Sequence, residues 1–259
     1  MERAGVIAWF LEPHDAAVSK LARGDQAQGA VSLIEGWTFR QLRAELAAAE
    51  GLKPTTRAMS DAELMAALGA PGVAPEGRFF PDTYSFAPGT TDLAVLRQAY
   101  AAMQRQLDEA WDARDPQTPL KSASEALTLA SIVEKETGLE ADRALVAAVF
   151  VNRLRLGMAL QTDPTVIYGL GERFDGNLRK RDLLADTPYN TYLRPGLPPT
   201  PIALPGRASL LAAVRPQASK ALYFVARGDG SSEFSVTLAD HNRAVNKYQR
   251  APAARGAGR

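Results

Sequence analysis

The chain has 259 residues, enough for one large domain or two small ones, and its 30 basic and 29 acidic side chains nearly cancel. This balance argues against a nucleic-acid-binding protein, which usually carries a basic excess on one face. Cysteine is absent and the only histidines are His14 and His241. Disulfides and thiol chemistry are therefore excluded, and we expect neither a zinc site nor a cofactor.

The first part of the chain has the pattern of a small α/β module. VSLI at 31–34 predicts a buried strand. Thr38 is expected to cap a helix with one apolar stripe, and Ser60 with Glu63 forms a capping box that opens a second helix. The order strand, helix, helix is typical of a small glycan-binding module of the LysM type. The Pro- and Gly-rich segment 70–77 predicts the boundary of this module.

The next part is mostly helical in pattern. Apolar residues spaced three to four apart predict a long helix from Thr91 to the breaker DPQTP at 115–119. Further helices are expected over 122–137 and 141–156. A shorter one should begin near Asp163, with Pro in its first turn.

The last part predicts a long loop and a hairpin. Residues 171–206 are rich in Pro and Gly, and a long loop in a compact domain is usually functional. A short helix over 207–214 follows, and then ALYFVA and EFSVT flank a Gly-Asp-Gly turn, which predicts a β-hairpin. Thr237 is expected to cap a final helix, and residues 251–259 to form a disordered tail.

The helix expected over 122–137 carries the most informative pattern. Its apolar residues cover more than half of the circumference, so we expect it to be mostly buried. Glu134 falls among them, and Glu136 lies at the opposite edge of the apolar arc. Burial raises the pKa of a carboxyl group, and a general acid for glycosidic cleavage needs that property. The alternative, which the pattern alone favours, is a structural ion pair with Arg143 or Arg153 on the next helix.

Several segments match a known family in order. They are EGRFFPDTYSF, ASIVEKET, VFVNRLRLGMALQTDPTVIYG, TPYNTYLRPGLPPTPIALPG, LYFVARGDG and FSVTLADHN. Together they resemble the endolytic murein transglycosylases, the YceG-like family. The resemblance is close over 76–248 and looser over 31–75. It implies an α+β fold, with a truncated LysM-like α/β module over 1–75 and a mainly helical catalytic domain with a small antiparallel sheet over 76–250.

The resemblance implies a lyase that cleaves the β-1,4 bond between N-acetylmuramic acid and N-acetylglucosamine and so terminates nascent glycan strands. The family's catalytic glutamate, the first of the IVEKE run, is Glu134 here. Its protonated form donates to the leaving oxygen. Its carboxylate then accepts the proton of the muramic C6 hydroxyl, which attacks C1 and forms a 1,6-anhydro ring. Such an internal nucleophile removes the need for a second carboxylate.

Five further residues are candidate substrate contacts. Gln161 and Asp163 carry sugar-binding side chains, although Asp163 is equally explained as a helix N-cap. Tyr189 and Asn190 lie in the long loop, which we expect to border the cleft; the alternative is packing within the loop. Glu136 either tunes the catalytic glutamate or holds an arginine.

The resemblance also implies where the protein acts. Members of the family are anchored by one N-terminal transmembrane helix, with the enzyme on the periplasmic side of the bacterial inner membrane. We therefore expect a cell-envelope protein with an anchor helix upstream of Met1. Its partners would be peptidoglycan glycan strands, with cell-wall synthesis enzymes as further candidates and no nucleic acid.

One departure from the family keeps alternatives open. The family often has a histidine in its closing strand, as Gly-His-x-Phe, where this chain has Ser232. A substrate contact made by that histidine would be absent, or replaced by Ser232 or Glu233. The alternatives are a non-catalytic peptidoglycan-binding or scaffold protein of the same fold and a lysozyme-like hydrolase.

Overall fold

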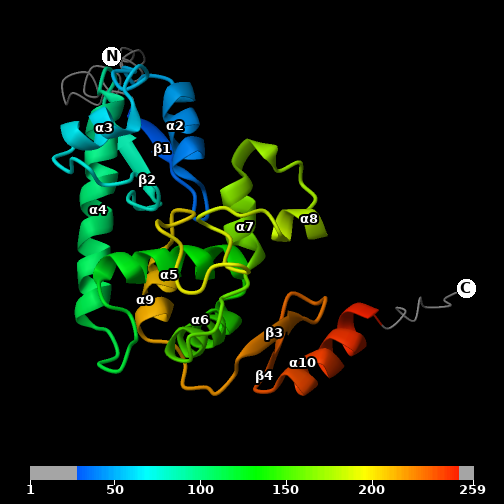
Figure 1. The fold of residues 1–259 in the computed structure, drawn as a ribbon. Coiled ribbons are helices and arrows are strands. Elements are labelled where there is room, and N and C mark those ends of the chain that lie inside the picture. The colour runs from blue at the N-terminus through cyan, green and yellow to red at the C-terminus, as the bar shows by residue number, and fades with distance from the viewer. Residues whose placement is uncertain (1–27, 251–259) are drawn as a thin grey trace, which may run out of the picture.

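The computed structural model describes residues 28–250 (Figure 1). It is a mainly helical α+β fold with two small antiparallel sheets, as predicted. The expected tail over 251–259 lies outside the described residues. In chain order the elements are β1 (Gly29–Ser32), α2 (Phe39–Ala48), α3 (Asp61–Ala67), β2 (Thr83–Phe86), α4 (Asp92–Asp112), α5 (Ala123–Glu136), α6 (Glu140–Arg155), α7 (Asp163–Leu170), η1 (Gly171–Arg173), α8 (Lys180–Leu183), α9 (Arg207–Val214), β3 (Tyr223–Ala226), β4 (Ser232–Ser235), α10 (Leu238–Val245) and the π-helical turn η2 (Asn246–Arg250).

The N-terminal unit is a strand, two helices and a strand. β1 pairs antiparallel with β2, so that Gly29 lies opposite Phe86 and Ser32 opposite Thr83. The predicted capping boxes at Thr38 and Ser60 both form. Because β2 follows the Pro- and Gly-rich segment 70–77, the sheet runs across the boundary expected there. The core of the unit also draws on both sides of that segment, with Val31, Leu42, Leu64, Phe79, Phe86 and Leu96 in one buried cluster.

The long helix α4 belongs to two cores. Val95, Leu96 and Ala99 in its first half pack in the N-terminal cluster, whereas Met103 and Leu107 pack among the later helices. In Figure 1 this helix runs along one side of the molecule, from α3 down to the level of α9. It therefore ties the N-terminal unit to the helical part.

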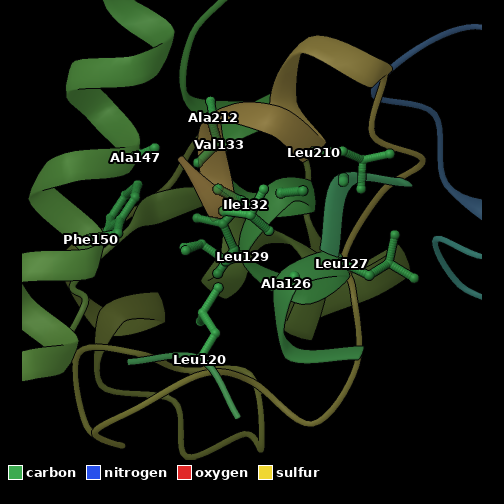
Figure 2. Close-up of a cluster of buried hydrophobic side chains, with 14 of the residues drawn as sticks. Leu120, Ala126, Leu127, Leu129, Ile132, Val133, Ala147, Phe150, Leu210 and Ala212 are labelled. Carbon is green, nitrogen blue, oxygen red and sulfur yellow. The ribbon is translucent and has the colours of Figure 1, made fainter. Parts of the chain in front are cut away.

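Helix α5 is the centre of the helical core. All its residues from 126 to 133 are buried, which confirms the predicted burial. Figure 2 shows Leu129, Ile132 and Val133 of this helix in one cluster with neighbours from other elements, among them Ala147 and Phe150 of α6 and Leu210 and Ala212 of α9. Ser131 is also buried, and its hydroxyl oxygen accepts a hydrogen bond from the Ile202 N–H at 3.0 Å, which satisfies this polar group in the core. The loop before α9 thus lies directly on α5.

The structure differs from the sequence prediction in three local details. Thr162, and not Asp163, occupies the N-cap position of α7, and Asp163 is its first residue. The expected long loop over 171–206 contains the short elements η1 and α8. The strand expected over 31–34 forms two residues earlier, because pairing with β2 fixes it. The hairpin β3–β4 and the Thr237 cap of α10 form as predicted.

Every helix in the described part of the chain is too short or too polar to cross a lipid bilayer.

Candidate active site

The carboxyl group of Glu134 lies in the last turn of α5, half-buried, where the loop over 201–206 returns to the core. Its Oε2 accepts a hydrogen bond from the Gly206 N–H at 3.0 Å. Gly206 is the N-cap residue of α9, and the positive end of a helix dipole favours a negative charge at this position. The long loop thus reaches Glu134 through its last residue.

A turn of the N-terminal unit, residues 34–37, packs against the same place. The Gly36 N–H donates to the Leu204 carbonyl at 2.8 Å, and the Leu204 N–H donates to the Trp37 carbonyl at 2.7 Å. Lys135 Nζ donates to the Gly36 carbonyl at 3.1 Å. A Cβ added at Gly36 would lie 4.0 Å from Cγ of Glu134. The turn is therefore docked on both α5 and the loop beside Glu134.

This turn brings in a second carboxyl group that the sequence did not indicate. The side chain of Glu35 lies against Gly206, so closely that a Cβ added there would be 1.8 Å from Oε1 of Glu35. Burial raises the pKa of Glu35 above its ordinary value of 4.5, and the negative charge of Glu134 raises it further, while Arg143 opposes both. In the sequence, Glu35 simply follows the strand predicted over 31–34 and precedes a glycine.

Glu136, two residues further along α5, faces a different neighbourhood. The Thr162 hydroxyl donates to its Oε1. Burial raises the pKa of Glu136 to about 7; the Thr162 hydrogen bond opposes this shift, and the nearby charge of Asp163 adds to it. Within residues 28–250 neither Glu134 nor Glu136 forms a salt bridge. The structural ion pair considered from the sequence is thus not found among them.

A cavity of about 600 Å³ opens beside Glu136, and we call it the Glu136 cavity. Two predicted contact residues, Gln161 and Asp163, line it together with Tyr192. The Tyr192 hydroxyl donates to Asp163 Oδ1 at 2.6 Å. The side-chain oxygen of Gln161 accepts from Arg153 Nη1 at 3.2 Å. The structure therefore brings three predicted site residues, Glu136, Gln161 and Asp163, to the Glu136 cavity. Glu134 does not line this cavity.

Gln161 adopts a backbone conformation unusual for a residue with a side chain. Its φ is +52°, and among residues 28–250 it is the single non-glycine residue with a positive φ. Such a conformation costs about 1–3 kcal/mol and tends to occur at functional sites. The side chain is exposed at the cavity. This feature supports a role for Gln161 beyond packing.

Further lining residues of the Glu136 cavity were missed from the sequence. The guanidinium of Arg153 lies 5.1 Å from the ring centre of Tyr223, which in turn stacks on His241 with ring centres 5.2 Å apart. Burial, and then the charge of Arg153, lowers the pKa of His241. These residues come from α6, β3 and α10, and no spacing in the chain links them.

Ser232 also lines the Glu136 cavity, and its N–H donates to Asp142 Oδ2 at 2.6 Å. The neighbouring Glu233 instead forms a salt bridge with Arg227 at 2.6 Å. Ser232 and Glu233 were the two candidate replacements for the family's histidine, and only Ser232 lines the Glu136 cavity.

Tyr189 and Asn190 lie elsewhere. Tyr189 lines a second cavity of about 700 Å³, together with Phe39 and Tyr168, and its hydroxyl is 2.8 Å from that of Thr200. Asn190 is fully buried: its amide group donates to two carbonyls of the loop, and its Oδ1 accepts from the Tyr192 N–H. For Asn190 the geometry matches the alternative of packing within the loop.

The second cavity contains another carboxyl group that the sequence did not single out. Glu76 accepts hydrogen bonds from the Phe39 N–H at 2.9 Å and from the Tyr168 hydroxyl at 3.0 Å. Burial raises the pKa of Glu76 to about 7. Glu76 thus links the start of α2 to α7. Across residues 28–250 there is no group of three or more His, Asp or Glu side chains placed to hold a metal ion.

Comparison with known proteins places this arrangement in a family. The model of the YceG-like family matches residues 12–247. The chain is 42% identical over 173 residues to the endolytic murein transglycosylase of Bacillus subtilis strain 168, covering 67% of this chain and 48% of that protein. It is 33% identical over 178 residues to the endolytic murein transglycosylase of Streptococcus pneumoniae strain D39, covering 67% and 32%. The match therefore spans about half or less of the length of these relatives.

A solved structure agrees with the sequence matches. The crystal structure of a YceG-like protein from Listeria monocytogenes superposes with a TM-score of 0.69 at 31% identity, covering 90% of this chain and 81% of that one. The α+β fold is thus shared with a solved relative. From the family match over most of its length, this chain belongs to the YceG-like family.

Proposed function

We propose that this chain is the catalytic part of an endolytic peptidoglycan lytic transglycosylase, with Glu134 as its acid/base. The observation that carries the proposal is the 42% identity to a relative named endolytic murein transglycosylase. The site gives it a physical basis, because the Glu134 carboxyl is half-buried, has no ion pair within residues 28–250 and accepts a hydrogen bond from Gly206.

The proposed reaction uses the carboxyl group of Glu134 twice. Protonated Glu134 gives its proton to the oxygen between N-acetylmuramic acid and N-acetylglucosamine, and the bond from C1 to that oxygen breaks. The muramic C6 oxygen then bonds to C1, and its proton passes to the Glu134 carboxylate. This closes a 1,6-anhydro ring and restores the acid, and no water is consumed. The Gly206 N–H can stabilise the carboxylate between the two transfers.

We propose the Glu136 cavity as the place where part of the glycan binds. Gln161, Asp163 and Tyr192 present an amide, a carboxylate and a phenol there, which suit sugar hydroxyls and ring faces. Tyr189 is a candidate contact in the second cavity. We propose Asn190 as a residue that shapes the loop, because its amide is already hydrogen-bonded inside it.

We also propose a cellular setting. An enzyme that cuts glycan strands acts in the cell envelope, so we place this one on the periplasmic side of the inner membrane with peptidoglycan as its partner. The residues up to about 75 are proposed as a LysM-like module, whose sheet is completed by β2, and 76–250 as the catalytic domain. Cell-wall synthesis enzymes are further candidate partners.

The test is a product analysis. Purified peptidoglycan is incubated with this chain, and the released fragments are identified by mass. We expect fragments that end in 1,6-anhydro-N-acetylmuramic acid and come from strand interiors. Reducing muramic ends, one water heavier, would instead identify a hydrolase, which needs a second carboxylate such as Glu35. Release of nothing by the folded protein would favour a binding or scaffold protein.

A further inference from the structure

Two carboxyl groups from distant parts of the chain meet at one glycine. Glu134 accepts the hydrogen bond of the Gly206 N–H at 3.0 Å. Glu35 occupies the space in which a Cβ of Gly206 would lie, with Oε1 1.8 Å from that position. The first group comes from α5 and the second from the turn over 34–37 of the N-terminal unit. Gly206 is thus the residue that allows both groups to approach.

The position of Glu35 is fixed by its neighbours in the turn. Two backbone hydrogen bonds join Gly36 and Trp37 to Leu204, at 2.8 and 2.7 Å. A third contact joins Lys135 Nζ to the Gly36 carbonyl at 3.1 Å. The N-terminal unit is therefore held against the site by the two residues that follow Glu35, and not through Glu35 itself.

From this geometry we propose that Glu35, supplied by the N-terminal unit, is a positioning residue of the active site: together with Glu134 it forms a carboxyl pair that holds one proton until the glycosidic oxygen takes it. The inference rests on the proposed function and deepens it. The N-terminal unit then completes the active site, in addition to any part it has in holding the glycan.

The physical reason is repulsion between like charges. Two carboxylates that share a site resist being ionised together, so the pair holds one proton to a higher pH than two isolated groups would. Burial, and then the charge of Glu134, raises the pKa of Glu35, as expected for two carboxyl groups that share a site. Because Glu35 is exposed, water and salt weaken the coupling, and we expect an effect of about one pH unit or less.

The other charged groups around the pair limit this effect without removing it. Arg143 on α6 lowers the pKa of Glu35. Lys135 on α5 is engaged with the Gly36 carbonyl. Arg207, the first residue of α9, turns toward α4 and donates to Gln106 and Glu109. The segment over 201–206 has no ionisable side chain.

The first experiment measures the pH dependence of kcat/KM on glycan strands for four proteins: wild type, Glu35→Gln, Glu35→Asp and the control Glu50→Gln. Glu50 is exposed in the same unit, in the turn after α2. At high pH kcat/KM falls because the general acid of the free enzyme has lost its proton, and this fall is the basic limb of the profile. We expect Glu35→Gln to move this limb to lower pH by about half a unit to one unit, and the other two variants to keep it. A Glu35→Gln limb that coincides with that of Glu50→Gln would overturn the proposal.

The second experiment needs no turnover, so it separates failure of this inference from failure of the proposed function. Carbon NMR follows the titration of the Glu35 carboxyl group in the wild type and in Glu134→Gln. Removing the Glu134 charge should lower the pKa of Glu35 toward its ordinary value. An unchanged Glu35 titration would show that the two groups are not coupled and would refute the inference, whatever the enzyme's products are.

Discussion

Glu134 and Glu136 lie two residues apart on one helix, yet they face different surroundings. Glu134 meets a backbone N–H of the loop before α9 and a carboxyl group of the N-terminal unit. Glu136 meets the hydroxyl of Thr162 and a cavity built from α6, the hairpin and α10. Two residues along a helix correspond to about 200° of rotation, so each glutamate serves one side of α5.

The comparison shows that titration behaviour alone does not identify the acid. Glu136 has a pKa of about 7 and lines a cavity, which are properties often found in a general acid. Glu134 is the residue that the family resemblance indicates. Glu76, in the other cavity, also has a pKa of about 7 with no part in the proposed chemistry. In Glu136 and Glu76 the raised pKa results mainly from burial, so the catalytic role of each carboxyl group must be tested separately.

The largest expected effect separates the two glutamates directly. Glu134→Gln keeps the shape of the side chain but removes its proton, so turnover should fall ~10²–10⁴-fold. Glu136→Gln should lose much less, because its neighbour Thr162 can still hydrogen-bond to the amide oxygen. Both are assayed on glycan strands, with circular dichroism and melting temperature as folding controls. The reverse order of losses would make Glu136 the acid.

Local signals in the sequence predicted the elements that carry these glutamates, because caps and apolar spacing act within one helix. The position of α5 and its buried stretch follow from the apolar spacing of residues close in the chain. The approach of Glu35 to Glu134 does not, since it depends on β1 pairing with β2 and on Leu204 binding the turn. For the same reason Arg153, Tyr223 and His241 could not be assigned to one cavity beforehand.

The next effect concerns stability on the Glu136 side. A folded-state pKa of about 7 against an ordinary 4.5 means that the folded protein binds more protons than the unfolded chain between these values. The contribution of Glu136 to stability is therefore lost as pH rises from about 4.5 to about 7, by up to the order of 3 kcal/mol.

Glu136→Gln removes this loss, so the variant should gain stability relative to the wild type as pH rises through that window. Urea unfolding at several pH values measures the difference. Glu76→Gln is a matched control with a similar pKa in the other cavity, and it should behave alike. A stability difference between wild type and Glu136→Gln that is constant with pH would contradict the burial of Glu136.

A smaller effect is expected at the glycine on the Glu134 side. Gly206 has φ −78°, which alanine adopts freely, and its N–H would remain available to Glu134. The new methyl group would displace the Glu35 carboxyl, whose side chain is flexible and exposed. Gly206→Ala should therefore stay folded and shift the basic limb of the pH profile as Glu35→Gln does. If Gly206→Ala instead keeps the wild-type limb, displacement of Glu35 has no consequence for the reaction.

The smallest effect concerns the strained residue in the Glu136 cavity. Glycine accepts a φ of +52° without steric penalty, so Gln161→Gly should relieve about 1 kcal/mol of backbone strain. It also removes the hydrogen bond from Arg153, which offsets part of that gain. We thus expect stability within about 1 kcal/mol of the wild type. If the glycan contacts this side chain, KM should rise several-fold while kcat stays nearly constant, because the contact is made before and during the reaction alike. Gln161→Asn, which keeps an amide and tolerates the left-handed region, should show a smaller rise. An unchanged KM in Gln161→Gly would show that the glycan does not depend on the Gln161 side chain, and would leave Asp163 and Tyr192 as the proposed contacts in this cavity.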